Sequence, residues 1–325
     1  MADLLAAAAS RERAITGASH DDGARSWERW QKWCQSVGCN DLYLDQFSQL
    51  ERNLLLGAFA MAVREGRFSK NRTDALVEGT VRSAISHVVQ AFRESGRQNP
   101  TKDSDNMLSV LLSRQFRAYR NDDPKEVQQK ALPFIVLREL AKRQVSELDK
   151  AISQLTICAG FFACRSCEYL KVPRREMKRT KLLRLRNIRF FEDGRLISTP
   201  SENLEFADSV AVTFEMQKNV HKHETVIHGR TDDAILCPVK QWAQLVNRIW
   251  TYPGTTEETP VCTVWRRDRR EQITSHQVIG SLRAACATIG SAQLGFEPEE
   301  ICTHSLRSGA AMEMYLAGYQ STRSC

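Results

Sequence analysis

Apolar residues recur at helical spacing in the first third of the chain. Four segments show this pattern: residues 24–38, 50–66, 73–96 and 106–120. In the first of them, Trp27, Trp30 and Cys34 fall on one helical face, and Gly38 provides a stop. Polar residues connect the four segments. We therefore predict a compact helical domain over residues 22–122.

The pattern changes twice after residue 122. Residues 123–133 are polar, contain proline and predict a linker. Two segments then alternate apolar and polar residues around a polar centre, residues 182–199 and 209–231, and predict short antiparallel hairpins. Helical periodicity occupies the rest of the domain: residues 133–143, 148–172 with a break at Gly160, 237–250, 275–295 and 303–318. The second domain, residues 134–325, is expected to be mainly α with a small antiparallel β-sheet, an α+β fold.

Composition excludes some classes of protein. No apolar run approaches the ~18 residues that a membrane-spanning helix needs, so we expect no membrane partner. The ten cysteines follow no secretory signal and are expected to be reduced thiols. Cys164 and Cys167 form one C-x-x-C pair, and His221 and His223 could complete a zinc-bound interaction module. Nothing else in the spacing supports zinc, and we expect no metal and no cofactor.

Positive charge is concentrated in the second domain. The chain carries a net charge of +7, and residues 171–189 hold nine basic residues and one acid. Residues 265–270 (WRRDRR) hold four more basic residues. One charge run is usually a solvated face, but two runs in one domain favour a surface that faces phosphates. In the first domain, Arg82, Arg93 and Arg97 are either phosphate contacts or ordinary solvated residues.

Four side chains could together act on a phosphodiester. Arg165 follows an apolar helix, Lys218 lies at a predicted hairpin tip, and His304 and Arg307 share one helical face through their H-x-x-R spacing. Guanidinium groups match the non-bridging oxygens of a phosphate and stay charged. A lysine can protonate a leaving oxygen, and a histidine can hold or pass a proton near neutral pH. Taken singly, each residue is equally explained as a helix cap or an exposed side chain.

The order and context of these residues resemble the catalytic domain of the tyrosine recombinases, the phage-integrase family. FFACRSCEYLKV is similar to the first-arginine motif, and TFEMQKNVHKHETVIHG to the hairpin that bears the family lysine. AILCPVKQW resembles the entry to the following helix, and THSLRSGAAMEMYLAG the His-x-x-Arg helix. The helical first domain fits the family's core-binding domain, so the resemblance covers about residues 22–318.

The resemblance implies a role for each of the four residues. Arg165 and Arg307 would clamp the scissile phosphate, His304 would assist as an acid/base or by positioning, and Lys218 would protonate the leaving 5′ oxygen. Lys222 lies in the same loop and is an alternative to Lys218. The implied partner is double-stranded DNA, on which copies of the chain would assemble as a homo-oligomer.

One part of the family pattern is not found. The family places a His or Trp after a glycine, and then the nucleophilic tyrosine, well downstream of the second arginine. Here the sequence ends at Cys325 with only Tyr315 and Tyr319 after Arg307. Tyr315 lies in a Met-Tyr-Leu run that suggests core packing rather than a nucleophile. Strand cleavage through a 3′-phosphotyrosine is therefore uncertain, and we expect a chain that lacks the nucleophile segment.

A second interpretation belongs to another class: a non-catalytic helical DNA-binding or chromatin-associated protein derived from a mobile element. In that case the basic runs alone would carry the affinity for DNA. The DNA target and the choice between integration, excision and resolution cannot be inferred from the sequence. The basic run at residues 171–189 also resembles a nuclear signal. The compartment stays open, nuclear in a eukaryote and cytoplasmic otherwise.

Overall fold

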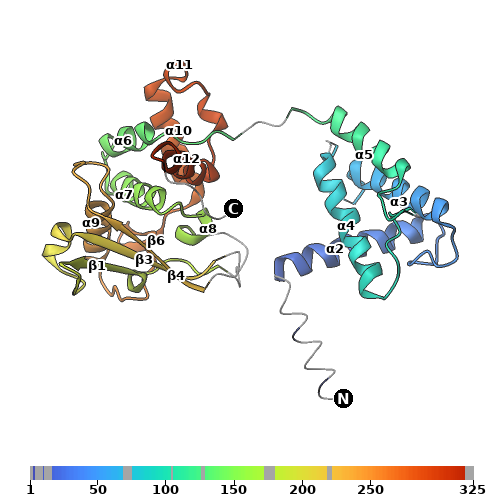
Figure 1. Cartoon of the computed structure of the whole chain (residues 1–325), viewed down its shortest axis with the longest axis horizontal. Helices are drawn as coiled ribbons and strands as arrows, with labels where there is room; N and C mark the ends of the chain where they lie inside the picture. The colour runs from blue at the N-terminus through green and yellow to red at the C-terminus, as the bar shows by residue number, and fades with distance from the viewer. Residues whose placement is uncertain are drawn as a thin grey trace. The chain divides into compact units, whose positions relative to one another are not determined.

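The chain folds into two compact units, Met1–Glu126 and Val127–Cys325, which we call the helical unit and the mixed unit. The computed structural model, shown in Figure 1, describes residues 3, 10, 17–68, 75–103, 105–125, 129–171, 180–217 and 222–318. Within these ranges, the predicted mainly helical fold with a small antiparallel sheet is confirmed.

Four helices form the described part of the helical unit: α2 (Gly17–Ser36), α3 (Gln49–Arg64), α4 (Glu78–Glu94) and α5 (Val110–Asp122). Their apolar stripes meet in a core rich in aromatic rings, in which Trp30 lies edge-on to Phe59 with ring centroids 5.1 Å apart. The stripe of α4 from Val81 to Phe92 is buried there. Ser48 and Glu51 cap α3 reciprocally, which satisfies two free N–H groups at its start.

An antiparallel sheet of four strands lies in the mixed unit, in the order β2 (Arg195–Ile197), β1 (Ile188–Glu192), β3 (Ser209–Met216) and β4 (Lys222–Gly229). Alternate residues of the two central strands point into the core: Ile188, Phe190, Val210, Val212 and Phe214. Helix α9 (Pro238–Trp250) packs against β3 and β4, and it begins with a proline whose missing N–H costs nothing at that position.

Helix α7 (Glu147–Phe161), whose central turns are buried on every side, packs against α9 and against α6 (Phe134–Lys142), α10 (Ser275–Ile289) and α12 (Thr303–Leu316). The short helix α8 (Ser166–Tyr169) follows α7 along the chain, and α11 (Ser291–Leu294) packs against α10. A separate hairpin of β5 (Thr263–Arg266) and β6 (Arg269–Gln272) precedes α10. The sequence analysis did not predict this hairpin, because its four arginines obscure the alternation of a strand.

Two segments can be compared in detail with their prediction. The apolar helix predicted over residues 148–172, with a break at Gly160, ends at Phe161, one residue after that break; Ala163 adopts a positive φ of 46° and α8 then begins separately. In the expected linker, Leu132 is buried in the core of the mixed unit and its N–H donates to the carbonyl of Ser305 (3.0 Å).

The described residues also bear on membranes and metals. None of their helices is long and apolar enough to cross a membrane. Their cysteines are free thiols. No group of three or more His, Cys, Asp or Glu side chains within the described ranges is arranged to hold a metal ion, and His221 lies outside those ranges.

Candidate nucleic-acid interface

Arg165 is fixed by the turn that joins α7 to α8. It occupies the N-cap of α8, and the carboxylate of Glu168 accepts hydrogen bonds from the Arg165 backbone N–H (2.7 Å) and from its Nη1 (3.2 Å). Glu168 is almost fully buried, whereas the Arg165 side chain keeps about 20% of its surface exposed. One buried carboxylate therefore holds both the backbone and the guanidinium of Arg165.

The residue that follows β3 also reaches Arg165. The Arg165 Nη1 lies 3.4 Å from Oε1 of Gln217, the last described residue before the hairpin tip. Lys218 is the next residue along the chain and lies outside the described residues. Lys222 begins β4, is exposed and pairs with Met216. The structure thus brings the predicted lysine hairpin to Arg165, and the choice between Lys218 and Lys222 stays open.

Arg307 reaches the same turn from α12. Its Nη1 donates a hydrogen bond to the carbonyl oxygen of Ala163 (2.7 Å), two residues before Arg165. The half-buried Arg307 also acts on Cys164. Burial raises the pKa of this thiol well above its usual value and Glu168 raises it further, while the Arg307 charge opposes the rise. The turn of residues 163–165 therefore carries one permanently charged guanidinium, that of Arg165, and is contacted by a second, that of Arg307, from a remote part of the chain.

Small residues allow α12 to lie close enough for this contact. A Cβ on Gly309 would lie 2.1 Å from the carbonyl oxygen of Leu132, which no side chain can occupy without a backbone shift. A Cβ on Gly160 in α7 would lie 3.2 Å from Leu306 of α12. The small residues around the H-x-x-R motif are thus explained by close packing, which places Arg307 beside the turn of Arg165.

His304 lies in the first turn of α12 and is exposed. Its backbone N–H donates to Sγ of Cys302 (3.2 Å). Within the described residues, no contact joins the His304 imidazole to Arg165 or Arg307. The predicted pairing of His304 with the arginines on one phosphate stays a prediction.

The expectation that Tyr315 packs in the core is wrong, since its side chain is 74% exposed. The burial of α12 ends at Ala310, and the following turns carry exposed apolar residues, Met312, Met314 and Leu316 among them. Tyr315 lies eight residues after Arg307, which is about 12 Å along a helix axis. The other tyrosine, Tyr319, lies outside the described residues.

The sequence analysis missed two contributors to this site, Glu168 and Gln217. A signal for Glu168 was present, because an acidic residue three positions after a helix N-cap commonly bonds back to the cap. For Gln217, the only signal in the sequence was its position next to Lys218. Both residues act on the Arg165 side chain rather than on a ligand.

The two basic runs have different surroundings. In the first run, residues 172–179 lie outside the described residues, and Arg184 and Arg186 both pair with Glu258. Arg186 pairs with Glu215 as well (2.8 Å), which contributes to the lowered pKa of that carboxyl after the side-chain hydrogen bond from Asn187. The second run forms the exposed tip of the β5–β6 hairpin.

No protein-family model matches the chain, and no curated protein matches it in sequence. The resemblance to a family therefore depends on the quoted motifs alone.

Proposed function

We propose that this chain is a DNA-binding protein of the tyrosine-recombinase type, in which Arg165 and Arg307 grip one backbone phosphate. The observation that carries the proposal is the hydrogen bond from Arg307 to the carbonyl of Ala163, next to the turn that Arg165 caps. Guanidinium groups that share one turn can present paired donors to the oxygens of a single phosphodiester.

The remaining roles follow the same resemblance. Lys218, or Lys222 in its place, would protonate the leaving oxygen, and His304 would position or transfer a proton. The duplex would be bound by more than one copy of the chain. We assign no nucleophile, because Tyr315 lies about 12 Å further along the axis of α12 than Arg307, and no contact among the described residues brings its side chain to Arg165 or Arg307. The proposal therefore concerns the binding of a backbone phosphate. In the family that the motifs resemble, such binding serves site-specific recombination.

The test is duplex binding by the full chain at several salt concentrations. Arg165→Ala and Arg307→Ala are each expected to weaken binding about tenfold, because a charge-assisted contact contributes about 1.5 kcal/mol. Arg195→Ala, an exposed arginine on β2, is the matched control. Binding that is absent or insensitive to salt would contradict the proposal, since phosphate contacts release counterions.

The non-catalytic scaffold gives a different result in the same assay. If the basic runs alone carry affinity, charge reversal across residues 171–189 abolishes binding while Arg165→Ala has no effect. A covalent adduct assay extends the test to cleavage. A duplex adduct that survives SDS and disappears in Tyr315→Phe would show that Tyr315 attacks phosphorus and would supply the nucleophile that the proposal leaves open.

A further inference from the structure

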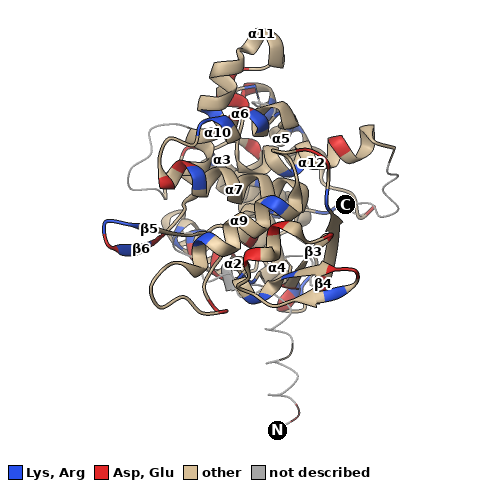
Figure 2. Cartoon of the chain, turned by 90° about the vertical axis from the view of Figure 1, so that its left-hand side faces the viewer, with Lys and Arg blue, Asp and Glu red and all other residues tan. Residues whose placement is uncertain are grey.

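The β5–β6 hairpin borders an open hollow of about 870 Å³ that contains neither Arg165 nor Arg307 in its lining. Its charged lining residues are Lys171, Glu258, Arg267, Arg269, Arg270 and Glu271. Figure 2 shows the basic residues gathered on the hairpin. Among the described residues that line the hollow, Pro260 is the only one with an apolar side chain.

Some of these charges are already paired within the protein. Glu271 lies 3.0 Å from Nε of Arg269 and 3.7 Å from Nη1 of Arg266. The Nε of Arg270 donates to the carbonyl of Pro253 (3.1 Å). Within the described ranges, Arg267 at the hairpin turn has no ion pair, and it is exposed. The same holds for Lys171, which is also exposed. Two cations thus line the hollow without a carboxylate partner in the part of the chain that the structure describes.

Uncharged groups also border the hollow. They include the N-cap Thr274 and Gln277 at the amino end of α10, where a helix carries partial positive charge. Thr274 and Gln277 cap each other, since the N–H and hydroxyl of Thr274 donate to Oε1 of Gln277 and the Gln277 N–H donates to the Thr274 hydroxyl. What the end of α10 offers an anion is therefore the partial charge of the helix rather than free donors.

We propose that this hollow binds a backbone phosphate of the same duplex, away from the phosphate held by Arg165 and Arg307. The inference rests on the proposed function for the identity of the ligand. Cations that are unpaired among the described residues and the amino end of a helix suit phosphodiester oxygens, and apart from Pro260 every described residue that lines the hollow is polar or charged. The contact positions the duplex and carries no sequence preference. Glu271 limits its strength by holding two arginines of the hairpin.

The experiment measures the binding of the full chain to a duplex of about 30 base pairs and arbitrary sequence. One variant removes a positive charge from the hairpin, and a second removes the carboxylate that pairs with two of its arginines. Arg267→Ala is expected to weaken binding and to lower the slope of log K against log salt by about 0.9, the value for one phosphate contact. Glu271→Gln is expected to tighten binding roughly threefold, since it frees Arg266 and Arg269 for phosphate. A gain in affinity cannot arise from misfolding. The matched controls are Arg195→Ala and Glu192→Gln, exposed residues outside the hollow.

Each outcome separates this inference from the proposed function. If both hairpin variants behave as their controls while Arg165→Ala weakens binding, the hollow is not a phosphate site and the proposed function stands. If the hairpin variants change affinity and Arg165→Ala does not, the hollow binds DNA and the arginine clamp is wrong. A wild-type chain that binds no duplex overturns both. Effects that differ between two unrelated duplexes would contradict a backbone contact.

Discussion

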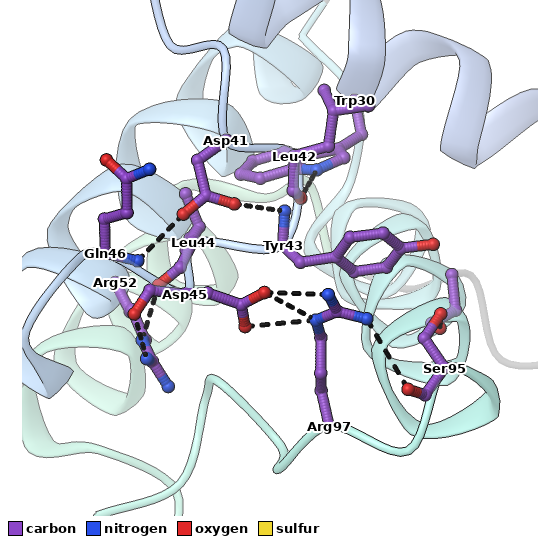
Figure 3. Close-up of polar contacts among 11 residues, drawn as sticks. Trp30, Asp41, Leu42, Tyr43, Leu44, Asp45, Gln46, Arg52, Ser95 and Arg97 are labelled. Carbon is purple, nitrogen blue, oxygen red and sulfur yellow. Dashed lines mark hydrogen bonds and ion pairs between the residues drawn. The ribbon is translucent and has the colours of Figure 1, made fainter.

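The two units of the chain use their arginines in different ways. In the helical unit, Arg97 lies over the ring of Tyr43 and pairs with Asp45, as Figure 3 shows. Arg82 pairs with Glu78 and lies over Phe116. Two of the three arginines that the sequence offered as phosphate contacts are thus engaged inside the unit; for Arg93, the third, no partner is found among the described residues.

In the mixed unit, by contrast, arginines from distant segments converge on shared locations. Arg165 and Arg307 meet at one turn, and the β5–β6 hairpin presents Arg267 to an open hollow. The comparison teaches that a count of basic residues does not locate a phosphate surface. What differs is how many guanidinium nitrogens are already engaged: Nε, Nη1 and Nη2 of Arg97 all have partners, whereas among the described residues only Nη1 of Arg165 has one.

The largest expected effect concerns Arg64 in the helical unit. This buried side chain pairs with Asp123 and donates to the carbonyls of Leu76 (2.7 Å) and Tyr119 (3.3 Å), so it joins α3 to α5 and to the segment before α4. Arg64→Ala should lower the free energy of unfolding by about 3 kcal/mol, because it leaves a carboxylate without its partner. Chemical denaturation measures this.

The control for Arg64 is the exposed Arg117 on α5, whose replacement by alanine should change stability by less than about 0.5 kcal/mol. Duplex affinity of the folded Arg64→Ala variant should equal that of the wild type. A loss of affinity comparable with that of Arg165→Ala would break the comparison between the two units.

Next in size is the close packing that places Arg307. Gly309→Ala should cost about 2 kcal/mol, since the added Cβ meets the Leu132 carbonyl. It should also weaken duplex binding, because α12 carries Arg307. Gly280→Ala in α10 is the matched control, since its Cβ meets nothing within 4 Å and should gain up to about 1 kcal/mol. Equal unfolding midpoints for the two variants would refute the packing argument.

A smaller effect is expected from pH in the mixed unit. Burial lowers the pKa of His228 below its usual 6.5, against a hydrogen bond with the backbone of Phe161 that raises it. The folded state then binds a proton less readily than the unfolded chain, so stability is complete above about pH 6.5 and declines as the pH falls toward the folded pKa. His228→Phe retains the edge-on contact with Phe162 and should make the unfolding midpoint less dependent on pH between pH 7 and 5.

The smallest effect is expected for Arg97. Its hydrogen bond to Asp45 lowers the pKa of that exposed carboxyl, so this pair stabilises the fold above the usual pKa of 3.8 and does so less as the pH falls through the folded value. Arg97→Ala should return the Asp45 pKa toward its usual value in an NMR titration. Duplex affinity should not change. Weaker binding would show that Arg97 contacts phosphate despite its partners.

Much of the fold was predictable because burial follows periodicity. The stripe from Val81 to Phe92 predicted α4, and the alternation at residues 209–231 predicted β3 and β4. The β5–β6 hairpin was not predictable from this signal, since its exposed arginines obscure the inward positions. Tyr315 was misjudged because an apolar sequence pattern does not tell where the neighbouring helices end.

The site was predictable only as a set of residue types. The sequence indicated Arg165 and Arg307, but their convergence depends on contacts between segments 144 residues apart, such as the one from Arg307 to Ala163. The partners of Arg97 were equally hidden, because Asp45 lies 52 residues away along the chain. Periodicity reports which face of a helix is buried, and it contains no information on which side chains meet across two elements.

The grip of Glu168 on Arg165 has a thermodynamic consequence. A free arginine loses about 2 kcal/mol of rotamer entropy when a ligand immobilises it. Arg165 has surrendered much of that freedom already, through a carboxylate that itself is buried. An incoming phosphate therefore meets a guanidinium that is oriented in advance, and the cost of ordering this side chain falls on folding rather than on recognition.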